Sequence, residues 1–187
     1  ADLRTAADLV HFGRENDAPE ALICAARIIG TTPTTEDTDN FHCITEHAKE
    51  PQPGPTAEDL LAEAAEMSDA EHIQTLIAQV EDIISNAERG NTAGPGHVNG
   101  AVVTYGIEEW HGDFYGNEWA EVTVVGDGVS DLDVRVYDDL GYLIAEDNST
   151  SPDCHVHWFQ RYTGHVHIEV SCYSSPYSHV HYTLYHN

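Results

Sequence analysis

The periodicity of apolar residues changes from helical to strand-like near the middle of the chain, and this change limits the fold more than any other feature. Within residues 1–96, apolar side chains recur at helical spacing, as at Leu22, Ala26 and Ile29. Within residues 97–187, after a glycine-rich connection, apolar side chains alternate with polar ones in short runs. We therefore predict an α+β protein: a small N-terminal helical bundle (1–96) followed by an antiparallel, jelly-roll-like β-sandwich (97–187).

Local signals predict where the helices begin and end. Asp17 before an Ala-Pro-Glu run is expected to cap one helix, and Gly30 to end it. Thr56 is expected to cap a shorter helix. The capping-box pattern Ser68–Glu71 is expected to open a long amphipathic helix that ends at Gly90.

The second half is expected to contain seven or eight short strands separated by Gly, Asp and Asn turns. The expected strands cover residues 101–110, 120–125, 132–137, 142–145, 155–158, 165–170 and 179–185.

The charge of the chain excludes two classes of partner. Acidic residues outnumber Lys and Arg by 33 to 7, which gives a formal net charge of −26. Nucleic-acid binding and attraction to anionic membranes both require a basic surface, and no apolar run reaches the length of a membrane span. Two explanations of the acidity stay open: solubility in a high-salt habitat, or attraction of a specific cationic ligand.

The four cysteines are separated by long intervals, so the C-x-x-C signature of zinc ribbons and thioredoxin-type sites is absent. Pairing within each half predicts the disulfides Cys24–Cys43 and Cys154–Cys172; four buried thiols in a cytosolic protein are the alternative. We expect an extracellular or periplasmic protein whose signal peptide has been removed.

Part of the second half resembles the bacterial pre-peptidase C-terminal domain family. The resemblance covers about residues 98–187 and rests on the turn and strand Gly126–Asp138, the G-x-L-I-A-x-D pattern from Gly141, the Gly164–Val170 strand and the closing Tyr182-Thr-Leu. It implies a β-sandwich module of a secreted protein that is not itself catalytic, and in some members binds polymeric substrate or calcium. The chain departs from the family pattern at Ser130 and Val166, and it contains neither H-E-x-x-H nor G-x-S-x-G.

Three copies of the tripeptide H-V-H give the sharpest chemical signal. Residues two apart on a strand share a face, so the valines are expected to point into the core and all six imidazoles outward. The six are His155, His157, His165, His167, His179 and His181. The resemblance implies that the second and third of these strands pair, and a Cys154–Cys172 bridge would bring the first beside them.

A surface of this kind is expected to bind a transition metal: zinc, copper, nickel or iron. Two alternatives are a histidine-rich surface that contacts another protein, and histidines that merely occupy solvent-exposed strand positions without binding anything. The other histidines are expected to be ordinary side chains rather than ligands; these are His11, His42, His47, His72, His97, His111 and His186. Metal binding by imidazole predicts sensitivity to pH between about 5 and 7.

Two weaker candidate sites are rich in carboxylates. Asp127, Asp131 and Asp133 surround a glycine turn and are candidate calcium ligands, with a solvated turn as the alternative.

Carboxylates and aromatic rings also gather around residues 108–119. Glu108, Glu109, Asp113 and Glu118 include a conceivable general acid and base. The nearby rings Trp110, Phe114, Tyr115 and Trp119 suggest either a carbohydrate- or protein-binding edge or part of the core.

Together these features predict an exported, non-enzymatic binding or assembly protein whose histidine face contacts a metal or a protein partner. The alternatives are a metal-free structural subunit of an extracellular or periplasmic assembly, including self-assembly, and a metal-dependent enzyme.

Overall fold

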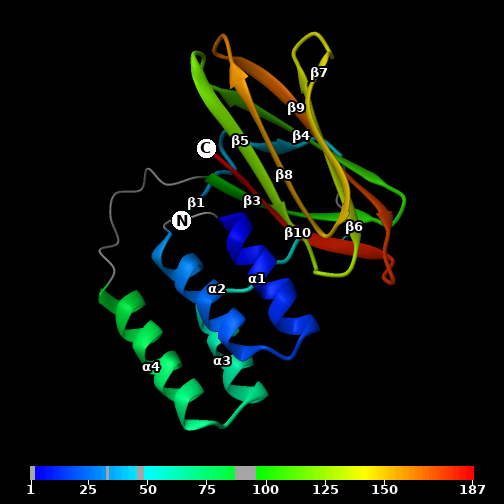
Figure 1. Ribbon diagram of the computed structural model, residues 1–187. Coiled ribbons are helices and arrows are strands. Elements are labelled where there is room, and N and C mark those ends of the chain that lie inside the picture. The colour runs from blue at the N-terminus through cyan, green and yellow to red at the C-terminus, as the bar shows by residue number, and fades with distance from the viewer. Residues whose placement is uncertain (1–2, 33, 46–48, 87–95) are drawn as a thin grey trace. The chain divides into compact units, whose positions relative to one another are not determined.

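The computed structural model describes residues 3–32, 34–45, 49–86 and 96–187, which fall into two compact units (Figure 1). One unit comprises Ala1–Thr34 and Pro55–Gly94, and the other Thr35–Gly54 and Pro95–Asn187. Residues 35–54 therefore belong with the strands, although the sequence pattern placed them with the helices. The expected helix end at Gly90 lies outside the described residues.

The helical unit contains four helices, and the positions of their ends only partly follow the sequence signals. The helices are α1 (Leu3–Glu15), α2 (Pro19–Thr31), α3 (Ala57–Met67) and α4 (Glu71–Asn86). The Thr56 cap of α3 is confirmed, because its hydroxyl accepts from the Asp59 N–H while the Asp59 carboxylate accepts from the Thr56 N–H.

Two predicted helix starts are wrong by one or two residues. Ala18, not Asp17, is the N-cap of α2, because Asp17 adopts a left-handed conformation with φ 49°. Ser68 does not open α4, because its hydroxyl accepts from the Ala70 N–H before the helix begins at Glu71. The carbonyl of Ala70, the residue just before the helix, accepts from the N–H groups of Ile73 and Gln74. Gly30 lies inside α2, where a side-chain carbon would come within 2.6 Å of Ile84 Cδ1. Gly30 thus permits the close approach of α2 and α4 instead of ending α2.

The second unit is a sandwich of two five-stranded sheets, which confirms the predicted fold class. Sheet A has the strand order β1-β3-β10-β5-β8, and sheet B has the order β2-β4-β9-β6-β7 (Figure 1). The strands are β1 (Thr35–Glu36), β2 (His42–Cys43), β3 (Gly96–Val103), β4 (Ile107–Phe114), β5 (Glu118–Val125), β6 (Asp131–Asp138), β7 (Leu143–Ser151), β8 (Asp153–Gln160), β9 (Gly164–Ser174) and β10 (His179–His186). All described pairs are antiparallel except β1 with β3.

The expected single strand over residues 101–110 is wrong. The chain turns between β3 and β4, where Tyr105 adopts φ 64° and the Gly106 N–H donates to the Val103 carbonyl. This turn carries the chain from sheet A to sheet B. Its consequence for function is that β4 becomes a strand of sheet B and lies beside β9.

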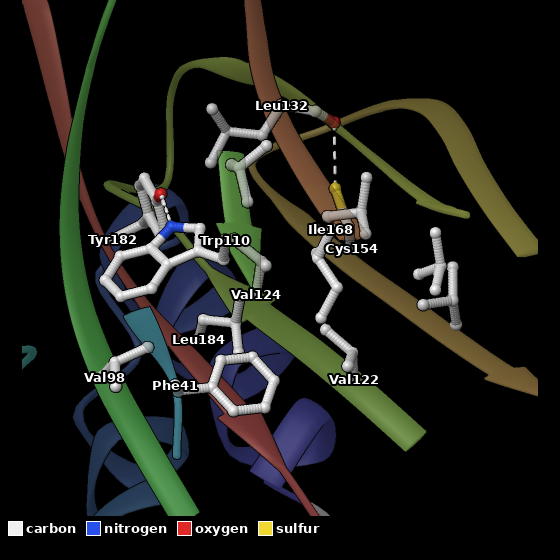
Figure 2. Packing of buried hydrophobic residues seen from close by; sticks show 14 of the residues in the cluster. Phe41, Val98, Trp110, Val122, Val124, Leu132, Cys154, Ile168, Tyr182 and Leu184 are labelled. Carbon is white, nitrogen blue, oxygen red and sulfur yellow. Dashed lines mark hydrogen bonds between the residues drawn. The ribbon is translucent and has the colours of Figure 1, made fainter. Parts of the chain in front are cut away.

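Valine is the most frequent residue of the core between the sheets, and the aromatic side chains of Phe41, Trp110 and Tyr182 pack among the aliphatic ones (Figure 2). A buried polar chain crosses it: Trp110 Nε1–H donates to the Tyr182 hydroxyl over 2.6 Å, and that hydroxyl donates to Glu108 Oε2 over 2.5 Å. The Glu108 carboxylate also accepts from the Ala101 N–H at 3.1 Å. Since Tyr182 lies on β10 and Glu108 on β4, this chain links sheet A to sheet B.

The predicted disulfides are not present: Cys24, Cys43, Cys154 and Cys172 are all free thiols. Cys154 lies on β8 in sheet A and donates to the Leu132 carbonyl of sheet B at 2.9 Å (Figure 2), whereas Cys172 lies on β9. Burial raises the pKa of both of these thiols, so they are held in the protonated form. Proximity in sequence was a poor guide here because the two cysteines belong to different sheets.

No described helix is both long and apolar enough to cross a membrane.

Candidate metal centre

The six H-V-H imidazoles point outward as predicted, but the three strands do not form one surface. The intervening Val156, Val166 and Val180 are all buried in the core, which confirms the alternation. However, β9 lies in sheet B, whereas β8 and β10 lie in sheet A with β5 between them. The implied pairing of the second and third histidine strands is therefore wrong, because the chain changes sheet between β9 and β10.

Only the β9 pair joins a cluster, and its third member comes from β4. Ligand atoms of His111, His165 and His167 all lie within 4.8 Å of one another, and no other such group occurs among the described residues. Register explains the proximity, because His111 is directly opposite His167 on the neighbouring strand. The two rings have centroids 4.2 Å apart.

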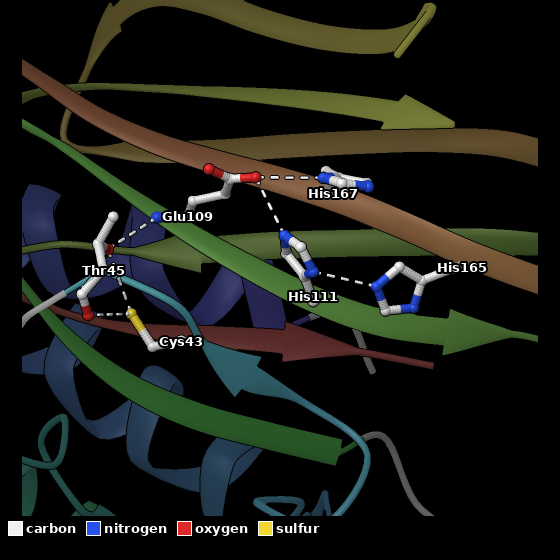
Figure 3. Close-up of polar contacts among 6 residues, drawn as sticks. All are labelled: Cys43, Thr45, Glu109, His111, His165 and His167. Carbon is white, nitrogen blue, oxygen red and sulfur yellow. Dashed lines mark hydrogen bonds and ion pairs between the residues drawn. The ribbon is translucent and has the colours of Figure 1, made fainter. Parts of the chain in front are cut away.

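Two carboxylates of β4 hold the three rings in place, and Figure 3 shows the contacts of one of them, Glu109. Glu109 Oε1 lies 3.0 Å from His111 Nε2 and 3.1 Å from His167 Nδ1. Asp113 Oδ1 lies 2.9 Å from His165 Nδ1. The hydrogen bonds from His111 and His167, the former being the stronger influence, lower the pKa of Glu109 and thereby keep it ionised.

These contacts fix which ring nitrogens remain for a ligand. An ionised carboxylate only accepts hydrogen bonds, so each contacting ring nitrogen carries the proton. In neutral imidazoles this leaves lone pairs on His111 Nδ1 and His165 Nε2. These two nitrogens face each other at 3.1 Å (Figure 3). Two facing lone pairs repel, and a cation between them, either a proton or a metal ion, removes the repulsion.

The spacing matches a shared metal ion. Two imidazole nitrogens bound to one tetrahedral zinc, each at about 2.0–2.1 Å, lie about 3.3 Å apart. The observed 3.1 Å requires little movement, and the same reasoning leaves His167 Nε2 as the third donor. Carboxylates that accept from the outer N–H of metal-bound histidines are the usual orienting partners of such ligands.

The histidines of sheet A have different surroundings. His155 Nδ1 lies 3.0 Å from the Thr123 hydroxyl and 3.5 Å from a Glu121 carboxylate oxygen, while the His157 ring lies 5.7 Å from the Trp119 ring. On β10, His179 contacts the Ser178 hydroxyl at 3.1 Å. Burial, with a smaller contribution from His179, lowers the pKa of His181.

Sequence reasoning missed His111, because it treated this residue as an isolated histidine. The signal was present in the alternation Glu109-x-His111-x-Asp113, which places two carboxylates and an imidazole on one face of a strand. Combining this pattern with a nearby H-V-H also required knowing that β4 pairs with β9, which the pattern does not contain.

The candidate calcium ligands are not brought together. Asp127 accepts from the Val129 and Ser130 N–H groups and therefore stabilises its own turn. Asp133 is buried, and its carboxylate contacts Arg135 at 3.3 Å. Together with Asp131 they form no converging group among the described residues.

The residues around 108–119 divide between core and surface. Glu108 is buried in the polar chain, Glu109 and Asp113 bind histidines, and Glu118 is exposed, so the four carboxylates do not form a simple acid–base pair. Among the rings, Trp110 and Phe114 are in the core, whereas Tyr115 and Trp119 are exposed.

His157 and His165 also line a cavity of about 720 Å³ between the β6–β7 turn and the loop that joins β8 to β9. Trp158, Phe159 and Tyr162 contribute to its wall. Its volume lies in the range of small-molecule sites.

No family model matches the chain, and no curated protein matches it. Among solved structures, this chain is similar to PliG, the periplasmic inhibitor of g-type lysozyme from Aeromonas hydrophila. The similarity covers 50% of this chain and 86% of PliG, with 13% sequence identity and a TM-score of 0.32. A second similarity, to a CBM4 structure, covers 49% of this chain and 72% of that one, with 8% sequence identity and a TM-score of 0.31. Similarities at this level indicate neither a ligand nor an activity.

Proposed function

We propose that the protein is an exported, non-enzymatic binding protein whose sheet B holds a transition-metal ion through His111, His165 and His167. One observation carries this proposal: His111 Nδ1 and His165 Nε2 face each other at 3.1 Å while their other ring nitrogens contact the carboxylates of Glu109 and Asp113. A bound cation satisfies both lone pairs. The resemblance of residues 98–187 to the pre-peptidase C-terminal domain family stays a prediction beside it.

The arrangement supports a binding role better than a catalytic one. The cluster lies on the outward face of a sheet, where His165 is partly exposed, and His111 and His167 do not line the cavity that His165 borders. A catalytic metal is typically held in a sheltered cavity that excludes water. The donor set of three neutral imidazoles suits zinc, copper, nickel or iron.

Titration of Zn²⁺ into protein purified without an affinity tag tests the proposal. We expect one Zn²⁺ site per chain. His111→Gln and His165→Gln should each lose more than about 100-fold in affinity for Zn²⁺, since removing a metal ligand costs more than removing a residue that only orients a ligand. His72→Gln, on the surface of the helical unit, is the matched control and should bind as the wild type does. Equal affinity in all four proteins contradicts the proposal.

The same titration distinguishes the metal-free alternatives. Because ligation requires neutral imidazole, the affinity for Zn²⁺ should fall as the pH is lowered from 7.5 to 5. A protein that binds no Zn²⁺ at pH 7.5, yet forms assemblies by light scattering, is instead a structural subunit.

A further inference from the structure

A fourth histidine lies next to the cluster, on the short strand β2. His42 is directly opposite His111 in the antiparallel register of β2 with β4. Its side chain is exposed, whereas the next residue, Cys43, packs against the core, so His42 faces outward with the cluster. His42, His111 and His167 therefore form a row across three neighbouring strands of sheet B.

The backbone of β2 is held beside the cluster from both sides. Before His42, the Phe41 ring is buried and stacks on His186 with ring centroids 3.9 Å apart. After it, the Ile44 N–H donates to the Glu109 carbonyl at 2.9 Å, and the Glu109 N–H donates to the Thr45 hydroxyl at 3.0 Å (Figure 3). Glu109 thus connects β2 through its backbone and the imidazoles through its carboxylate.

The distance to the cluster is within reach of a rotating side chain. Residues directly opposite on antiparallel strands have Cβ atoms about 4.5–5.5 Å apart. His42 is not among the three residues whose ligand atoms already converge, but its exposed ring is free to change rotamer. Three histidines leave one position of a tetrahedral zinc unfilled.

We propose that His42 supplies the fourth ligand, so that the metal ion closes a four-histidine centre and ties β2 to sheet B. This inference rests on the proposed function, since it assigns the remaining position of the same metal. Sites with four protein ligands are structural, whereas catalytic sites keep a position for water or substrate. The centre would then fasten residues 41–45, which are joined to β4 by a two-residue strand, instead of activating a water molecule.

Cobalt(II) reports the ligand set, because the positions and intensities of its visible absorption bands depend on the coordination number and on which atoms are bound. We expect the wild type to give the intense tetrahedral spectrum. His42→Gln should retain Co²⁺ with affinity reduced at least about 10-fold and with visible bands that differ from those of the wild type, because a water oxygen replaces an imidazole nitrogen. His179→Gln, which removes an outward histidine of sheet A, is the control.

Amide hydrogen exchange gives a second, independent readout. Co²⁺ should slow exchange at Ile44 in the wild type and in His179→Gln, but not in His42→Gln. Identical spectra, affinities and exchange in the wild type and His42→Gln overturn this inference while the proposed function stands. A wild type that binds no Co²⁺ overturns both.

Discussion

The same tripeptide, H-V-H, gives a converging cluster in sheet B and separate side chains in sheet A. On β9, the residues opposite His165 and His167 are Asp113 and His111. On β10, the residues opposite His179 and His181 are Val103 and Ala101 on one side, which supply no ligand atoms.

The remaining copy lies at the edge of sheet A. On β8, His155 and His157 are opposite Thr123 and Glu121 of β5. Thr123 forms a hydrogen bond with His155 and Glu121 an ion pair with it, but neither supplies a third imidazole. The comparison teaches that a motif on one strand sets only the direction of its side chains, whereas the neighbouring strand decides whether they form a site.

Replacing each H-V-H pair in turn gives the largest expected difference. His165→Gln/His167→Gln should abolish high-affinity Zn²⁺ binding, with a loss of at least about 1000-fold, because two of the ligands are gone; this exceeds the 10–100-fold effect of removing residues that only orient the ligands. The matched pairs His155→Gln/His157→Gln and His179→Gln/His181→Gln should bind within about two-fold of the wild type. Competition with a chelator measures all three. Comparable losses in the sheet A variants would remove the distinction between the sheets.

The sequence predicted the parts of this fold that depend on local pattern. Alternation identified which face of each histidine strand is buried, and Thr56 marked the beginning of α3. It did not predict which strands are neighbours, because pairing depends on where the chain crosses between sheets, as it does at Tyr105. For the same reason, His111 and the absence of a Cys154–Cys172 disulfide could not be obtained from the sequence.

The segment 35–54 shows a second limit. Its Thr- and Pro-rich composition is that of a connector, yet Phe41 is buried and β1 and β2 each extend one sheet. Two-residue strands carry too little periodicity to be recognised. Their placement depends on partners more than 50 residues away along the chain.

A buried histidine on β10 extends the comparison to the inward face. His186 stacks on Phe41, and its Nε2 lies 3.7 Å from an Asp37 carboxylate oxygen. Burial, opposed by Asp37, lowers the pKa of His186 to about 4. At His186, the unfolded chain takes up a proton near pH 6.5, whereas the folded protein does not. The contribution of His186 to the free energy of unfolding is therefore complete above pH 6.5 and is lost as the pH falls to about 4.

Replacing His186 by Phe should remove this decline, which is about 3 kcal/mol for His186 alone. Urea unfolding at pH 7 and pH 4.5, with a chelator present, gives the free energy of unfolding of the wild type, His186→Phe and the outward control His179→Gln. The wild type and His179→Gln should lose more stability on acidification than His186→Phe does. Parallel losses in all three proteins would show that protonation of His186 does not control the acid sensitivity.

The smallest expected effect concerns the carboxylates beside the two kinds of histidine. Glu109 contacts two imidazoles of the cluster, whereas Glu121 lies 3.5 Å from His155 alone. Glu109→Gln should weaken Zn²⁺ binding by about 10–100-fold, because the amide orients the rings less strongly and no longer supplies a negative charge. Glu121→Gln removes the same charge from sheet A and should leave the affinity unchanged. Equal losses of Zn²⁺ affinity in the two variants would mean that the effect is one of overall charge and that Glu109 has no positioning role. A loss of affinity that is confined to Glu109→Gln, and that disappears at pH 5 because protons compete for the rings, shows that Glu109 acts through the histidines.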